Sequence, residues 1–176
     1  LVLPITEARE WGWDVLALAL AVQNLAWGVF AIIAGGQADR IGNLRVILGA
    51  VALYASGMYL MAWSSTELAI VSTAGVLVGA GVAGTSFGIV LPAIARAVPE
   101  ERRGWALGVG TAAGSFGQFL VVPAMQAVVD QVGWFLALQY LGLAGLAMVV
   151  FALPLARYGG TQQVTSKIDD RNFSLV

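Results

Sequence analysis

Residues 68–95 read LAIVSTAGVLVGAGVAGTSFGIVLPAIA, and none of these 28 residues carries a charge. A transmembrane helix needs about 20 predominantly apolar residues to cross roughly 30 Å of hydrocarbon. The stretch is long enough for this, and it lacks the alternating polarity of a membrane β-strand. Further uncharged stretches of similar length occupy residues 15–38, 46–66, 104–129 and 131–156. The sequence therefore predicts an all-α, polytopic transmembrane helix bundle with five complete spans.

The composition excludes other classes of protein. Of the 176 residues, 59% are hydrophobic and 11% are charged, whereas soluble domains have roughly 45–50% apolar and about 25% charged residues. Disordered chains are poor in apolar residues and rich in charge, so disorder is excluded as well. The net charge of −1 shows no excess of basic residues of the kind that binds nucleic acid.

The chain offers little for catalysis. It contains no Cys and no His, which removes disulfides, a thiol nucleophile and an ordinary zinc site. None of the five predicted spans holds a carboxylate, an amine or a guanidinium, and Lys167 is the only lysine. We expect no catalytic residue, no metal site and no cofactor, so the protein is not predicted to be an enzyme. Proton relays in membranes generally use Asp, Glu or His, so these spans predict no proton coupling of their own.

The basic residues predict the orientation. Because successive spans alternate in direction, the connections after the first, third and fifth spans share one side. These segments carry eight of the nine basic residues: Arg40, Arg45, Arg96, Arg102, Arg103, Arg157, Lys167 and Arg171. The positive-inside rule places this side in the cytoplasm. Loops 39–45 and 96–103 and the C-terminal tail are therefore predicted to be cytoplasmic, in a multi-pass protein of a plasma membrane, with a bacterial inner membrane favoured.

Both ends of the chain suggest a longer protein. The sequence begins with Leu1 rather than Met, and Leu1–Ile5 is typical of the tail of an apolar segment. Residues 159–176 are polar and carry mixed charges. We predict a membrane bundle over residues 1–158 and a cytoplasmic linker over 159–176. A helix is expected before Leu1, and further chain after the linker.

The loop after the first span has the most specific pattern. Residues 35–45 read GGQADRIGNLR, which fits G-x-x-x-D-R-x-G-x-x-R. Gly35 and Gly36 are expected to close the preceding helix and to admit a close neighbour. Gly42 is expected to supply the left-handed conformation of a tight turn. A plain turn with topogenic arginines fits the same residues equally well.

This loop resembles the signature cytoplasmic loop of the major facilitator superfamily, which joins the second and third helices of a twelve-helix fold. GVLVGAGVAGTSFG, residues 75–88, resembles the glycine-dense fourth helix. PEERRGWALGVGTAAGSFGQFLVVP, residues 99–123, resembles the following loop and fifth helix, closest to the monocarboxylate and oxalate–formate antiporter-like branches. One departure is that an Arg often found in the fourth helix is absent, and Leu77 and Val78 stand in that region.

The resemblance implies that the chain contains five complete spans of the six-helix N-terminal half. It implies secondary active transport of a small solute by alternating access, with a monocarboxylate or another organic anion as a candidate substrate. The partners would be the lipid bilayer, the solute, the missing first helix and the C-terminal half. In the family, the Asp and Arg of the loop help to lock the cytoplasmic gate. Carried over, the gate residues are Gly35, Asp39, Arg40, Gly42 and Arg45, with Arg96 and Arg102 as further partners.

Uncharged polar groups near the middle of the spans are the candidate substrate contacts. They are Gln118, Gln23, Asn24, Thr85 and Ser86. An amide in hydrocarbon is costly unless it is paired, so these side chains should face the protein interior. Gln118 is the leading candidate and Gln23 the next. The alternative for each of them is a hydrogen bond between helices. For the chain as a whole, the alternative is a small non-transporting membrane protein that acts as an assembly or scaffold subunit.

Overall fold

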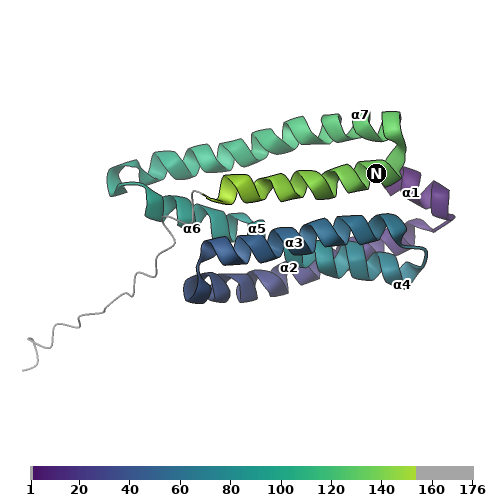
Figure 1. Cartoon of the computed structure of the whole chain (residues 1–176), viewed down its shortest axis with the longest axis horizontal. Helices are drawn as coiled ribbons and strands as arrows, with labels where there is room; N and C mark the ends of the chain where they lie inside the picture. Colours follow the sequence, from purple (N-terminus) through teal and green to yellow (C-terminus); the bar gives the residue numbers. More distant parts are fainter. Residues whose placement is uncertain (1, 154–176) are drawn as a thin grey trace, which may run out of the picture.

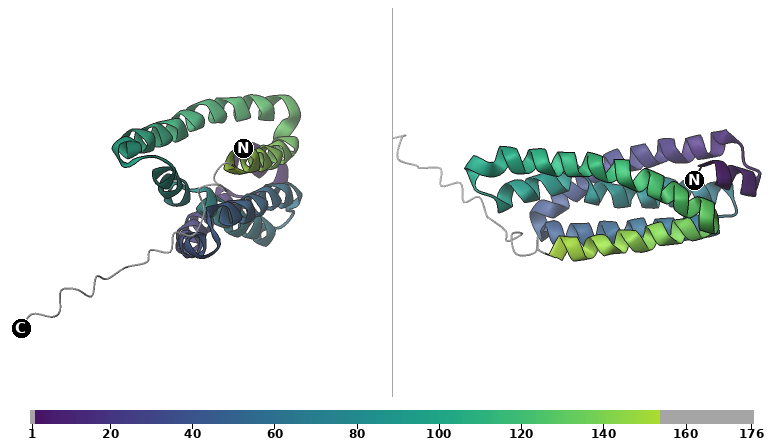
Figure 2. Two further views of the ribbon diagram at one scale, coloured as in Figure 1. Left: turned by 60° about the vertical axis from the view of Figure 1, so that its left-hand side comes forward. Right: turned by 90° about the horizontal axis from the view of Figure 1, so that it is seen from above.

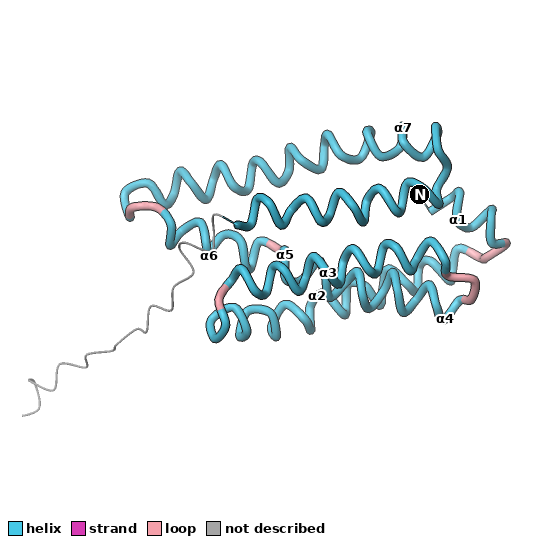
Figure 3. The backbone as a smooth tube through the Cα atoms, viewed as in Figure 1, coloured by secondary structure: helices cyan, strands magenta, loops and turns pink. Residues whose placement is uncertain are grey.

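The computed structural model describes residues 2–153, and every regular element within that range is helical (Figure 3). In chain order the elements are α1 (Val2–Arg9), α2 (Trp13–Ile41), α3 (Asn43–Trp63), α4 (Glu67–Ile70), η1 (Val71–Leu77), α5 (Val78–Thr85), α6 (Phe87–Ala97), η2 (Glu100–Arg102) and α7 (Arg103–Ala152). The predicted all-α class is confirmed. The predicted linker, residues 159–176, lies outside the described residues.

Within the described range, four helices are long and apolar enough to cross a membrane. They are Trp13–Ile41, Asn43–Trp63, Glu67–Ala97 and Glu100–Ala152. The fourth has 53 residues, which at 1.5 Å per residue would extend for about 80 Å. Gly133 interrupts it with φ 80° and ψ 165°, and there α7 folds back into two antiparallel arms (Figure 1). We call residues 103–132 the first arm and residues 134–152 the second arm.

The segment between Glu67 and Ala97 is a chain of short helices rather than one regular helix. The Thr66 hydroxyl accepts a hydrogen bond from the Ala69 amide at 3.2 Å and so caps α4. The stretch η1 is π-helical, so its backbone hydrogen bonds span one residue more than those of an α-helix. Ser86 separates α5 from α6 with an extended backbone, ψ 166°. Non-α backbone of this kind is tolerated inside a membrane where neighbouring helices surround it.

Glycines allow α5 to approach α2 and α3 closely. A methyl group built on Gly79 would lie 2.6 Å from the Gln23 carbonyl oxygen of α2, and one on Gly81 would lie 2.6 Å from the Tyr54 nitrogen of α3. Small residues at such contacts bring backbones together where hydrocarbon supplies no hydrophobic drive. These glycines therefore serve in helix packing.

The two arms of α7 have different surroundings (Figure 2). In the second arm, Gly145 faces the Tyr54 ring of α3. In the first arm, Gly114 faces the Phe87 ring of α6. Beyond this contact with α6, most of the first arm is exposed within the described part of the chain, including Phe116 and Phe119. The first arm is thus the least covered part of the bundle.

We predict that Gly81→Ala destabilises the protein by about 1–3 kcal/mol, because the added methyl meets rigid backbone of α3. Gly49→Ala is the matched control, since a methyl there meets nothing within 4 Å among the described residues. Thermal unfolding of the detergent-purified protein measures both. Equal midpoints for the two variants would contradict the close packing of α5 on α3.

Candidate functional site

The turn between α2 and α3 consists of a single glycine. Gly42 has φ 90° and ψ 149°, and its amide donates to the Ala38 carbonyl oxygen at 3.1 Å. The predicted left-handed glycine is confirmed. The expectation that Gly35 and Gly36 close the helix is wrong, because α2 continues through both to Ile41. A glycine costs only about 1 kcal/mol inside a helix, and that is less than leaving backbone groups unpaired in hydrocarbon.

Asn43, directly after this turn, connects it to the end of α6. Its side chain is 6% exposed, and its Oδ1 accepts a hydrogen bond from the Arg96 guanidinium at 3.3 Å. Of the basic residues proposed as loop partners, Arg96 is the one that the structure brings to the turn. Sequence reasoning missed Asn43, although its position immediately after the turn glycine was a usable signal.

The other charged residues of the predicted gate point outward. The side chains in question are all exposed: Asp39, Arg40, Arg45 and Arg102. Asp39 makes no hydrogen bond or ion pair with any residue in the described range 2–153. The carboxylate is therefore open to parts of the protein beyond that range.

Three of the substrate candidates bond to their own helices. Asn24 donates to the Leu20 carbonyl oxygen at 2.8 Å. The hydroxyl of Thr85 donates to the Gly81 carbonyl oxygen at 3.2 Å, and that of Ser86 donates to the Ala83 carbonyl oxygen at 2.7 Å. The structure thus accounts for these three groups locally and does not bring them together into one site.

Gln23 and Gln118 differ from these three, since neither side-chain amide has a hydrogen-bond partner within the described residues. Gln118 is exposed on the first arm of α7, one turn beyond Gly114. Gln23 is half-buried in α2. Because an unpaired amide in hydrocarbon costs several kcal/mol, both side chains require water, solute or another part of the protein as a partner.

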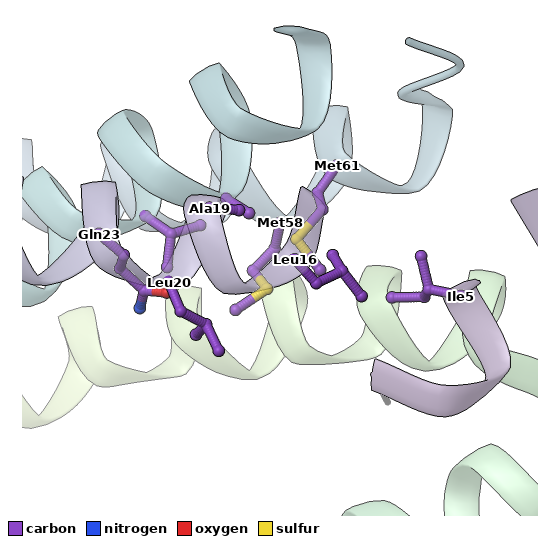
Figure 4. Close-up of a pocket in the computed structure, with 9 residues that line it drawn as sticks. Ile5, Leu16, Ala19, Leu20, Gln23, Met58 and Met61 are labelled. Carbon is purple, nitrogen blue, oxygen red and sulfur yellow. The ribbon is translucent and has the colours of Figure 1, made fainter. Parts of the chain in front are cut away.

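Among residues 2–153, Gln23 is the one polar side chain that lines a cavity of about 120 Å³ between α1, α2, α3 and the η1–α5 segment (Figure 4). The remaining lining residues are Ile5, Leu16, Ala19, Leu20, Met58, Met61, Ala74 and Val78. A cavity with so few polar groups holds water poorly. It therefore supplies no hydrogen-bond partner for the Gln23 amide.

Sequence reasoning also missed a second polar contact, which is buried at the C-terminal end of α3, away from the Gly42 turn. The hydroxyls of Ser64 and Thr73 lie 3.1 Å apart and are 5% and 9% exposed. Thr73 also donates to the Ala69 carbonyl oxygen at 2.7 Å. Thr73 lies in the π-helical stretch η1. The spacing of apolar residues in the sequence does not predict a π-helix.

The long apolar helices of the described range have the length and composition of membrane spans. Residues 1–171 match the family model of the Major Facilitator Superfamily, and the chain belongs to this family. The family resemblance of the loop at residues 35–45 is confirmed.

The chain is also similar to probable anion transporter 2, chloroplastic, of Oryza sativa subsp. japonica. The two share 30% identity over 95 residues. The matched region covers 53% of this chain and 17% of the relative, so the chain spans a small part of that protein's length.

Proposed function

We propose that the chain forms the N-terminal part of a secondary active transporter that moves a small solute by alternating access. Family membership supports transport. The observation that carries the proposal is the pair of unpaired amides, Gln23 and Gln118, each near the middle of a long apolar helix. In transporters of this kind the solute binds near the bilayer midplane, between moving units, and unpaired amides at that depth are suited to contact it.

The bundle crosses the membrane five times in this proposal, because each arm of α7 is taken as a separate span. Two observations support this count: a 53-residue helix is far longer than the bilayer is thick, and Gly133 reverses the chain inside it. With five spans, loops 39–45 and 96–103 face the cytoplasm by the positive-inside rule. The membrane would be the plasma membrane, in bacteria the inner membrane.

A small organic anion is the proposed solute, with monocarboxylates first. Support comes from the name of the rice relative and from the resemblance of residues 99–123 to the monocarboxylate and oxalate–formate antiporter-like branches. Amides such as Gln118 donate hydrogen bonds to carboxylate oxygens. The predicted spans hold no cation, so a positive charge opposite the solute would come from the C-terminal half, as would any proton coupling.

The preceding helix and the C-terminal half are the proposed partners within the same protein. The exposed apolar side chains of the first arm, including Trp105, Phe116 and Phe119, would meet these parts or lipid. Asp39 is proposed to interact there as the gate residue, with Arg40, Arg45 and Arg102 beside it, since its carboxylate is free of partners within the described range.

The solute class is tested by uptake into liposomes that contain the full-length protein. The probes are radiolabelled lactate, oxalate and inorganic phosphate, with choline as a cationic control. We expect saturable uptake of at least one anion and none of choline. Transport of choline alone, or of no probe, would contradict an anion transporter; the second outcome would favour the scaffold alternative.

Gln118→Leu is expected to lower uptake of the transported anion about tenfold, because a lost hydrogen bond to a charged group costs about 1.5 kcal/mol. Gln126→Leu is the matched control on the same arm, since the Gln126 amide already donates to Asp130 at 2.9 Å. Equal uptake by the two variants would show that Gln118 does not contact the solute.

Asp39→Asn is expected to shift the full-length protein toward the inward-open state by removing a charge that locks the cytoplasmic gate. Accessibility of single cysteines introduced on each side reports the shift. Glu101→Gln, another exposed acid at the same end of the bundle, serves as the control. An unchanged inward–outward equilibrium in Asp39→Asn, with unchanged transport, would overturn the gate role.

A further inference from the structure

The chain contains two helix–glycine–helix units of the same design. In the first, Gly42 joins α2 to α3; in the second, Gly133 joins the two arms of α7. Their backbone angles are close, φ 90° and ψ 149° against φ 80° and ψ 165°, and they are the two glycines with positive φ among the described residues. Each follows an aspartate by three residues, Asp39 and Asp130. The two turns lie at opposite ends of the bundle (Figure 1).

The units also match in the positions that they bury. Gly133 lies 91 residues after Gly42, and the same offset relates three pairs of buried residues: Ala38 and Val129, Ile47 and Leu138, Val51 and Gly142. These three are half of the six residues that the second unit buries, and they lie on both sides of the turn. The two units run in opposite directions (Figure 1).

Each unit packs on corresponding parts of the other half of the bundle. Ile47 of the first unit shares a hydrophobic cluster with Ile89 of α6 and Ala152. Leu138 of the second unit shares one with Ile5 of α1 and Ala62. In the first cluster, Ile89 lies in the helix that precedes the second unit, and Ala152 lies in the last turn of the second unit. In the second cluster, Ile5 lies in the helix that precedes the first unit, and Ala62 lies in the last turn of the first unit.

An arginine reaches the residue after the turn glycine in both units. Arg96, next to the last residue of α6, donates to Asn43 Oδ1 at 3.3 Å. Arg9, the last residue of α1, places its guanidinium carbon 5.6 Å from the centre of the Trp134 ring. Arg9 also donates to the Ala62 carbonyl oxygen at 3.4 Å. An amide oxygen and the face of an indole are both electron-rich partners for a guanidinium.

We propose that Arg96–Asn43 and Arg9–Trp134 are equivalent clamps at the two ends of the bundle. Each clamp fixes the helix that precedes one unit to the turn of the other unit. Arg96 and Arg9 are thus positioning residues, which make the two units move as one body. The Phe135 ring lies edge-on to the rings of Trp134 and Trp63, with ring centroids 6.0 Å and 5.3 Å apart. Phe135 thus holds the Trp134 indole in place for Arg9. The proposal does not depend on which solute is transported.

Hydrogen exchange in the full-length protein tests the clamps by location. Arg9→Gln should raise amide exchange over residues 138–141 about two- to fivefold, as loss of a cation–π contact predicts, and leave residues 47–50 unchanged. Arg96→Gln should do the reverse. Arg9→Lys should restore most of the protection, because a Lys cation also binds an indole face. Glu7→Gln, at an exposed position of the same helix as Arg9, is the matched control.

A double-mutant cycle separates a clamp from general loosening. In a Trp134→Leu background, Arg9→Gln should change exchange over 138–141 by less than half as much as it does alone, whereas in Trp134→Phe it should keep its effect. Two results would overturn the proposal. One is an equal rise over 47–50 and 138–141 in Arg9→Gln; the other is an effect of Arg9→Gln that Trp134→Leu leaves undiminished.

Discussion

Every peptide group placed in hydrocarbon must find its hydrogen-bond partner within the protein, because an unpaired group there costs several kcal/mol. This constraint explains why the described chain is helical almost throughout and why two of its reversals are so short. Gly42 and Gly133 each turn the chain within a single residue, which leaves few backbone groups unpaired. The same constraint explains why the hydroxyls of Ser72 and Thr73 donate back to carbonyl oxygens of their own helix.

Hydrocarbon also removes the hydrophobic drive that brings helices together in water, so close contact depends on small side chains. Gly79 and Gly81 place the backbone of α5 against α2 and α3 on two sides. A core packed in this way leaves little space for polar side chains that lack partners. Among the candidate substrate contacts, Gln23 and Gln118 are the two without a hydrogen-bond partner in the described part of the chain, which is why a functional interpretation rests on them rather than on the hydroxyls of Thr85 and Ser86.

The sequence was sufficient for the fold class and the family, since both depend on patterns that recur along the chain. The uncharged stretch 68–95 falls within the helical segment Glu67–Ala97, and the loop at residues 35–45 carried the family resemblance. The details that failed depend on contacts between distant residues or on small energy differences. Asn43 and Arg96 are 53 residues apart, so spacing alone could not pair them. Spacing also could not predict that the side chain of Asn24 folds back onto its own helix.

Rigidity and unpaired amides are complementary in a binding protein. A site that is already ordered before the solute arrives loses less conformational entropy on binding, so more of the contact energy appears as affinity. The close contact of Gly79 with the Gln23 carbonyl oxygen fixes the backbone beneath one amide, and the contact of Gly114 with Phe87 fixes the arm one turn from the other. In the proposed alternating-access mechanism the bundle would move as a body, and the close contact beneath Gln23 would preserve the position of that amide while the access to it changes.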